Sequence, residues 1–93
     1  MPQNTTITAV PNVWTQLTDA NVTAISFQNV SGYYGLFSGT TGASAPTTLA
    51  GAIRYNPGQG ERAVALADMF PGISAVRLWV LSEQAISVMV SHA

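Results

Sequence analysis

Hydrophobic and polar residues alternate with a period of two along most of this chain. Every second residue between Ala75 and Leu81 is a large aliphatic one, and Val22–Val30 and Ala85–Val90 repeat the alternation. Such a pattern, rich in β-branched and aromatic residues, is typical of β-strands with one buried face. Further candidate strands lie at Thr5–Val10, Val13–Leu17, Tyr33–Phe37, Ala52–Tyr55 and Ala63–Leu66.

Turn-forming residues separate these segments. They recur as Pro11-Asn12, Asp19-Ala20-Asn21, Ser31-Gly32, Asn56-Pro57-Gly58 and Pro71-Gly72. This spacing predicts an all-β fold, a small antiparallel β-sandwich or barrel of about seven or eight short strands. Leu81–Gln84 is predicted to join the last two strands as a hairpin. One short helical turn is expected near residues 65–70, stopped by the Pro71-Gly72 pair.

The segment Ser38–Gly51 (SGTTGASAPTTLAG) departs from the alternation. It has no charge, and Leu49 is its one large apolar residue. This Ser/Thr/Gly/Ala-rich composition predicts a long flexible loop. An alternative is an arm that lies along a neighbouring subunit and becomes ordered on assembly. With this loop, residues 1–93 are predicted to form a single β domain, because halves of so short a chain could not each hold a core.

Charged residues are scarce, at 8% of the chain, and none of them is lysine. An ordinary soluble domain has roughly 25%. The chain is 47% apolar, and Thr, Ser, Asn, Gln and Gly supply most of the remaining residues. Because surface charge keeps small domains dispersed, we expect much of the outer surface to be buried against copies of the chain or a larger assembly.

Several partner classes are not expected. The net charge is −1, whereas a protein that binds nucleic acid needs a basic surface to neutralise phosphates. The longest apolar region, Ala75–Val90, is interrupted by Arg77 and by Ser82-Glu83-Gln84, so no membrane span is expected. The N-terminus has neither the basic start nor the apolar run of a secretory signal. Cysteine is absent, so packing alone must hold the fold.

Few residues are candidates for catalysis or metal binding. His92 is the only histidine, and its place near the chain end favours a solvated or interface position over a catalytic one. The four carboxylates can each be explained as turn or cap residues; they are Asp19, Glu61, Asp68 and Glu83. We therefore expect no enzyme activity, cofactor or metal. A small hydrolase would need Glu61 and Asp68 to converge in a cleft.

The aromatic residues divide between core and contact positions. Phe27, Phe37 and Phe70 are expected in the core, whereas Trp14 and Trp79 are expected in the core or at a subunit interface. The adjacent Tyr33 and Tyr34 are expected in a strand, where one should face inward and the other outward. The outward tyrosine is the candidate contact with a ligand or partner.

The arginines are the second set of candidate contacts. Arg62 follows Glu61, and Arg77 lies within an apolar strand on the same face as Trp79. A charge in such a strand is costly unless it is paired, so we hypothesise that Arg77 pairs with Asp68 or Glu61 of a neighbouring subunit. The full set of candidate interface residues is Trp14, Tyr33, Tyr34, Arg62, Arg77 and Trp79.

Four segments carry a resemblance to a known group of proteins: Val13–Asp19, Ile25–Asn29, Asn56–Glu61 and Leu66–Gly72. In them the chain resembles the small virion proteins of tailed bacteriophages, which are short, cysteine-free β proteins rich in Thr, Gly and Ala. The resemblance implies a β-sandwich or barrel that trimerises or docks on a capsid, and it carries over no catalytic residues. The chain has no long fibrous or coiled-coil segment, so a complete tail fibre is not expected.

These observations predict a capsid decoration (cement) protein. It would act as a homotrimer whose partners are the major capsid protein or other virion proteins, and it would reach the virion from the host bacterial cytoplasm. Two alternatives remain open. One is a tail-tip or head-fibre domain that binds host-surface glycan through Tyr33 or Tyr34 and the Ser38–Gly51 loop. The other is a different tail structural protein.

Overall fold

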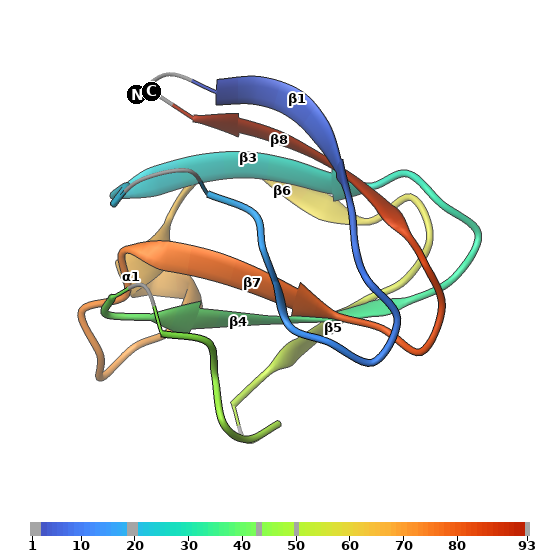
Figure 1. The fold of residues 1–93 in the computed structure, drawn as a ribbon. Helices are drawn as coiled ribbons and strands as arrows, with labels where there is room; N and C mark the ends of the chain where they lie inside the picture. Colours follow the sequence, from blue (N-terminus) through green and yellow to red (C-terminus); the bar gives the residue numbers. More distant parts are fainter. Residues whose placement is uncertain (1–2, 19–20, 43, 50, 93) are drawn as a thin grey trace.

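The computed structural model describes residues 3–18, 21–42, 44–49 and 51–92. It contains eight strands and one short helix: β1 (Gln3–Thr8), β2 (Thr15–Gln16), β3 (Ala24–Asn29), β4 (Gly35–Thr40), β5 (Ile53–Tyr55), β6 (Gly60–Ala65), α1 (Leu66–Met69), β7 (Arg77–Leu81) and β8 (Ser87–His92). The strands form two four-stranded antiparallel sheets, which face each other in Figure 1. The predicted all-β class is confirmed, as a sandwich rather than a closed barrel.

The first sheet has the strand order β1-β8-β3-β6, and the second has the order β2-β7-β4-β5. Alternate residues of both sheets meet between them, as the period of two requires. At the centre the rings of Phe27, Phe37 and Tyr55 form a cluster, with centroids 4.9 to 5.2 Å apart. The predicted burial of Phe27, Phe37 and Phe70 is confirmed.

Most connections of the chain cross from one sheet to the other, and only β4 and β5 are consecutive strands of one sheet. β7 belongs to the second sheet and β8 to the first, so the predicted hairpin at Leu81–Gln84 is wrong. This connection instead bridges the two layers, where the buried Ser82 hydroxyl donates to the carbonyl oxygen of Tyr34 at 2.9 Å. Alternation shows that a strand has one buried face. It does not show whether two successive strands pair within one sheet or lie in two facing sheets, because both arrangements bury one face of each strand.

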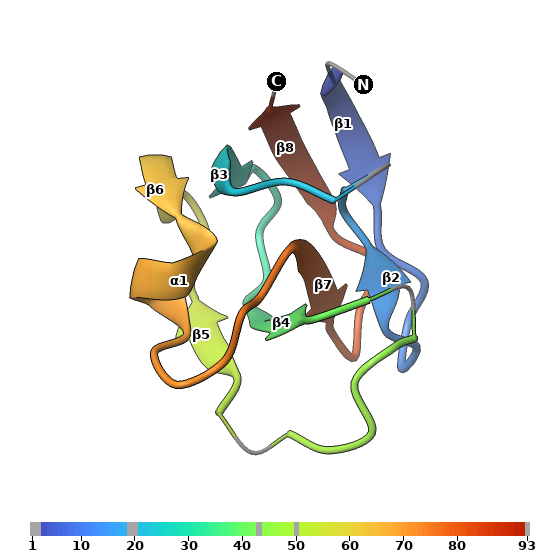
Figure 2. The same ribbon diagram turned by 90° about the vertical axis from the view of Figure 1, so that its left-hand side faces the viewer.

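β4 extends three residues beyond the predicted boundary at Phe37. Ser38, Gly39 and Thr40 pair with Trp79, Leu78 and Arg77 of β7, so these residues belong to the sheet and not to the loop. The segment that follows lies on the side of the second sheet away from the first (Figures 1 and 2). Residues 43 and 50 of the predicted loop lie outside the described residues, as do residues 19 and 20 of one predicted turn.

The fully buried Asn29 at the end of β3 links the two sheets. Its side-chain nitrogen donates to the carbonyl oxygen of Tyr33 at 2.7 Å and to that of Tyr55 in β5 at 3.3 Å. Its side-chain oxygen accepts from the backbone and the hydroxyl of Ser31. A buried amide satisfied in this way is stabilising, and it fixes the path of residues 30–34 into β4.

Candidate functional site

The outer face of the second sheet brings apolar, aromatic and basic side chains together. Leu36 of β4 lies between Arg54 of β5 and Leu81 of β7 in the register. Trp79 lies one row further along, paired with Ser38 on one side and with Gln16 of β2 on the other. We call the set Tyr34, Leu36, Arg54, Trp79 and Leu81 the aromatic face.

Tyr33 and Tyr34 precede β4, which begins at Gly35. The expectation that they lie in a strand is therefore wrong. Their rings stack with centroids 4.8 Å apart, both are half-buried, and Tyr33 packs against the core. The Arg54 guanidinium lies 4.1 Å from the centre of the Tyr34 ring, a cation–π contact. The Tyr33 hydroxyl donates to Glu83 Oε1 at 2.9 Å. This hydrogen bond to Glu83 raises the pKa of Tyr33 above its ordinary value of 10.0.

A hollow of about 270 Å³ lies beside Tyr34. Its apolar lining consists of Tyr34 and the leucines Leu36, Leu49 and Leu81. Its hydrogen-bonding residues are Asn12, Ser82 and Glu83. An apolar wall with a few polar groups is the usual lining of a small-molecule site. Leu49 comes from the segment 38–51, so that segment contributes to this hollow.

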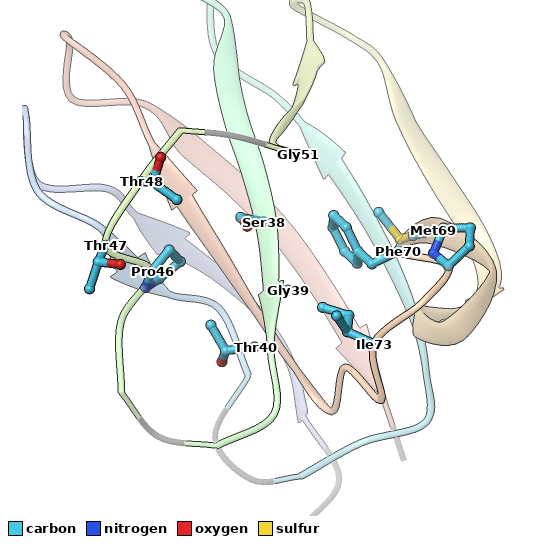
Figure 3. Close-up of a pocket in the computed structure, with 11 residues that line it drawn as sticks. Ser38, Gly39, Thr40, Pro46, Thr47, Thr48, Gly51, Met69, Phe70 and Ile73 are labelled. Carbon is cyan, nitrogen blue, oxygen red and sulfur yellow. The ribbon is translucent and has the colours of Figure 1, made fainter.

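Other residues of the same loop line a larger hollow of about 450 Å³, which Figure 3 shows. Loop residues 46–48 form one wall, and Met69, Phe70 and Ile73 form the wall opposite. The Phe70 ring can approach β4 because Gly39 has no side chain; a Cβ there would lie 2.7 Å from ring carbon Cδ2. No ionisable side chain lines this hollow, so it offers contact surface rather than acid–base chemistry.

Trp79 and Arg77 lie on the outer side of β7, because Leu78 and Val80 between them are in the core. Trp79 is nevertheless only 6% exposed, and its Nε1 donates to Thr40 Oγ1 at 2.8 Å. The predicted shared face of Arg77 and Trp79 is confirmed. Arg77 Nε donates to Asn21 Oδ1 at 2.8 Å within the chain, whereas pairing with an acid of another subunit stays a prediction.

The six predicted interface residues do not form one site. Tyr33, Tyr34, Arg77 and Trp79 belong to the second sheet or to the segment that enters it, and the half-buried Trp14 lies just before β2. Arg62 is exposed in β6 of the first sheet. The sequence-based set missed Leu36, Arg54 and Leu81. For Arg54 a signal existed, since it alternates with the buried Tyr55 in a predicted strand.

The described carboxylates and the histidine occupy different elements: Glu61 lies in β6, Asp68 in α1, Glu83 between β7 and β8, and His92 in β8. Glu61 accepts a hydrogen bond from the Tyr55 hydroxyl at 3.0 Å, and it lines a hollow that Asp68 does not line. His92 is expected from the sequence to be either solvated or at an interface. It is 7% exposed in β8, because the final strand docks against β1 and β3, so it is not solvated; an interface position stays a prediction. Within the described ranges, no three His, Asp or Glu side chains are grouped to hold a metal ion.

Burial and the hydrogen bond to Glu61 raise the pKa of Tyr55 to about 12. Tyr55 also belongs to the aromatic cluster of the core, so its hydroxyl is held at the inner margin of the second sheet. This residue therefore stabilises the fold and does not line the hollow beside Tyr34.

Comparisons with family models, with curated proteins and with solved structures found no match to this chain. Among the residues that the structure describes, no helix is long and apolar enough to cross a membrane.

Proposed function

We propose that this chain is a virion structural protein, a capsid decoration (cement) protein that binds capsid subunits in many copies. The observation that carries the proposal is the aromatic face: one tyrosine and two leucines that are partly exposed and one exposed arginine, beside the buried Trp79, on a chain with few charges. Aromatic residues and arginine are enriched at protein interfaces, where a few buried anchors supply most of the affinity.

The mechanism is repeated burial of uncharged surface. Each Å² of apolar area removed from water contributes about 25 cal/mol before the costs of association are subtracted. A weak contact made at many equivalent positions of a shell adds up, because every copy that bridges two capsid subunits opposes their separation. The low charge of the chain limits the desolvation penalty of such contacts.

The hollow beside Tyr34 supports a second candidate function, recognition of host-surface glycan by a tail-tip or head-fibre domain. Sugar rings stack on aromatic side chains, and their hydroxyls bond to polar groups such as Asn12, Ser82 and Glu83 in the lining. Leu49 adds a contribution from the loop.

The number of copies per purified particle distinguishes these roles. Quantitative mass spectrometry against the major capsid protein should give a ratio near one for a shell-wide decoration protein. A few copies per particle would place the protein in the tail or at a vertex and would favour glycan binding or another tail role. Its absence from particles would overturn the virion proposal.

Variants of the aromatic face test how the protein docks. Tyr34→Ala should weaken rebinding to particles stripped of the protein by about tenfold, as expected for an interface anchor. Gln28→Ala is the matched control, because Gln28 is exposed on the outer face of the other sheet. Equal rebinding of both variants would contradict docking through the aromatic face. A glycan array on which Tyr34→Ala loses binding would favour the second candidate.

A further inference from the structure

The four edge strands of the sandwich differ in how they are protected against pairing with another chain. A sheet edge carries unpaired backbone N–H and C=O groups, and proteins protect such edges with short strands, charges, prolines or bulges. In the second sheet, β2 has two residues, and β5 has three, with Arg54 at its centre. Both edges of the second sheet are therefore protected.

The β6 edge of the first sheet is also protected. It carries Glu61 and Arg62, and its register with β3 shifts between Ile25 and Phe27. At this bulge Ala63 has φ of 51°, and its backbone N–H is bonded to the Ser26 hydroxyl. A bulge of this kind interrupts the flat ladder that another strand would need.

β1 has none of these devices in the part of the chain that the structure describes. It is six residues long (QNTTIT), contains no charge and no proline, and pairs with β8 in unbroken register from Gln3↔His92 to Thr8↔Ser87. Thr5 and Ile7 pair with the core residues Val90 and Val88, and Ile7 packs against the core. The other described side chains of β1, and Thr5 itself, are exposed. Six regular residues with one bare backbone edge form a template for a further antiparallel strand.

We infer that β1 is the edge through which two copies of this chain pair, antiparallel and about a twofold axis at Thr6. This places Asn4 opposite Thr8 on the outer face and Thr5 opposite Ile7 on the core side. The second copy suits the edge because no like charges meet, β-branched residues oppose each other, and the half-buried Ile7 gains a neighbour. The two first sheets then form one continuous sheet.

This pairing does not depend on the proposed virion role. An isologous contact closes at two copies, so it predicts a dimer and not the trimer expected from the sequence. The aromatic faces of both copies remain open, because they belong to the other sheet.

Sedimentation equilibrium of the full chain tests the inference, since one chain has a mass of 9.7 kDa. We expect twice that mass for the unmodified protein and, for Thr6→Lys, at least a roughly tenfold rise in the dimer dissociation constant, because two lysines would then face each other. Gln28→Lys is the matched control. Thr6 and Gln28 both lie opposite Met89 on the outer face, one on the edge strand and the other on an inner strand. The control should leave the dissociation constant unchanged.

A cysteine pair provides a second readout that does not depend on weakening the contact. The chain has no cysteine, so Thr6→Cys can form a disulfide only with another molecule, and opposed antiparallel residues lie within disulfide reach. Oxidation should link Thr6→Cys into covalent dimers and leave Gln28→Cys without a covalent link between its two chains. A monomeric or trimeric unmodified protein, or equal behaviour of the two lysine variants, would overturn the inference.

Discussion

The two outer faces of this sandwich differ in composition although both arise from the same alternating pattern. On three of its four strands, β1, β8 and β3, the first sheet presents mainly polar side chains around Met89, among them Asn4, Thr6, Thr8, Ser26, Gln28 and Ser91. The second sheet presents Tyr34, Leu36, Arg54, Trp79 and Leu81. The first face has little to offer a partner through its side chains, so its contribution is the backbone edge at β1. The second sheet has protected edges, so what it could offer a partner is the side chains of its outer face.

Substituting a glycine by alanine should lower the free energy of unfolding to a different extent in the two sheets, and most in the first sheet. A Cβ on Gly60 of β6 would lie 2.0 Å from the carbonyl oxygen of Phe27 and 2.7 Å from Gln28 Cα. These are backbone atoms of β3 and cannot move without disturbing the strand ladder. Gly60→Ala should therefore lower the free energy of unfolding by about 3 kcal/mol or more.

Gly39→Ala in the second sheet should cost less than Gly60→Ala. The new Cβ would meet the Phe70 ring at 2.7 Å and Ala75 Cβ at 2.9 Å, which are side-chain atoms at longer distances than the backbone oxygen met at Gly60. Urea denaturation of both variants measures the difference, with Gly32→Ala as the control, since nothing lies within 4 Å of a Cβ at that position. Equal losses for Gly39→Ala and Gly60→Ala would contradict the expectation that the backbone contacts of Gly60 tolerate a Cβ less well than the side-chain contacts of Gly39.

The link between the sheets should be the next most sensitive point. Asn29→Ala removes the donor to the carbonyl oxygens of Tyr33 and Tyr55 and leaves both without this partner. The expected loss is about 2 to 4 kcal/mol of unfolding free energy, because buried polar groups left unpaired are costly. Asn4→Ala, on the exposed surface of β1, should change stability by less than about 0.5 kcal/mol. A small effect at Asn29 would show that this amide does not hold the layers together.

The sequence predicted the class of fold because alternation reports local burial directly. It placed the phenylalanines in the core and the short helix at α1 correctly. Strand partners were not predictable in the same way: Leu81–Gln84 fits a hairpin as well as it fits a crossing between layers. The end of β4 was misplaced because Ser38, Gly39 and Thr40 lack the apolar residues that mark a strand, although β7 and the Phe70 ring hold them there.

The candidate site was predicted only in part, for a similar reason. Tyr34 and Trp79 could be proposed from residue type alone. Leu36, Arg54 and Leu81 become a site only through the register of β5, β4 and β7, which brings together residues far apart in the chain. Sequence periodicity shows which side of a strand a residue occupies, but not which strand lies next to it.

Two tyrosine–carboxylate pairs provide the finest test of the difference between an interior and a surface position. Tyr55 donates to Glu61 at 3.0 Å from the margin of the core, and Tyr33 donates to Glu83 at 2.9 Å beside the aromatic face. Burial and Glu61 raise the pKa of Tyr55 from 10.0 to about 12, so the unfolded chain loses this proton at a lower pH than the folded chain. The stability gained from Tyr55 is therefore fully present below pH 10.0 and is lost as the pH rises towards 12.

Urea midpoints measured across this alkaline range should fall for the unmodified protein and fall less steeply for Tyr55→Phe. Tyr33→Phe should keep most of the slope, because Tyr33 lies at the surface, where solvent screens its interaction with Glu83. If Tyr33→Phe flattened the profile and Tyr55→Phe left it steep, the coupling between ionisation and folding would lie at the outer face and not between the sheets. The expected order instead places the stability linked to tyrosine ionisation at the inner margin of the second sheet, and leaves little of it at the tyrosine beside the aromatic face.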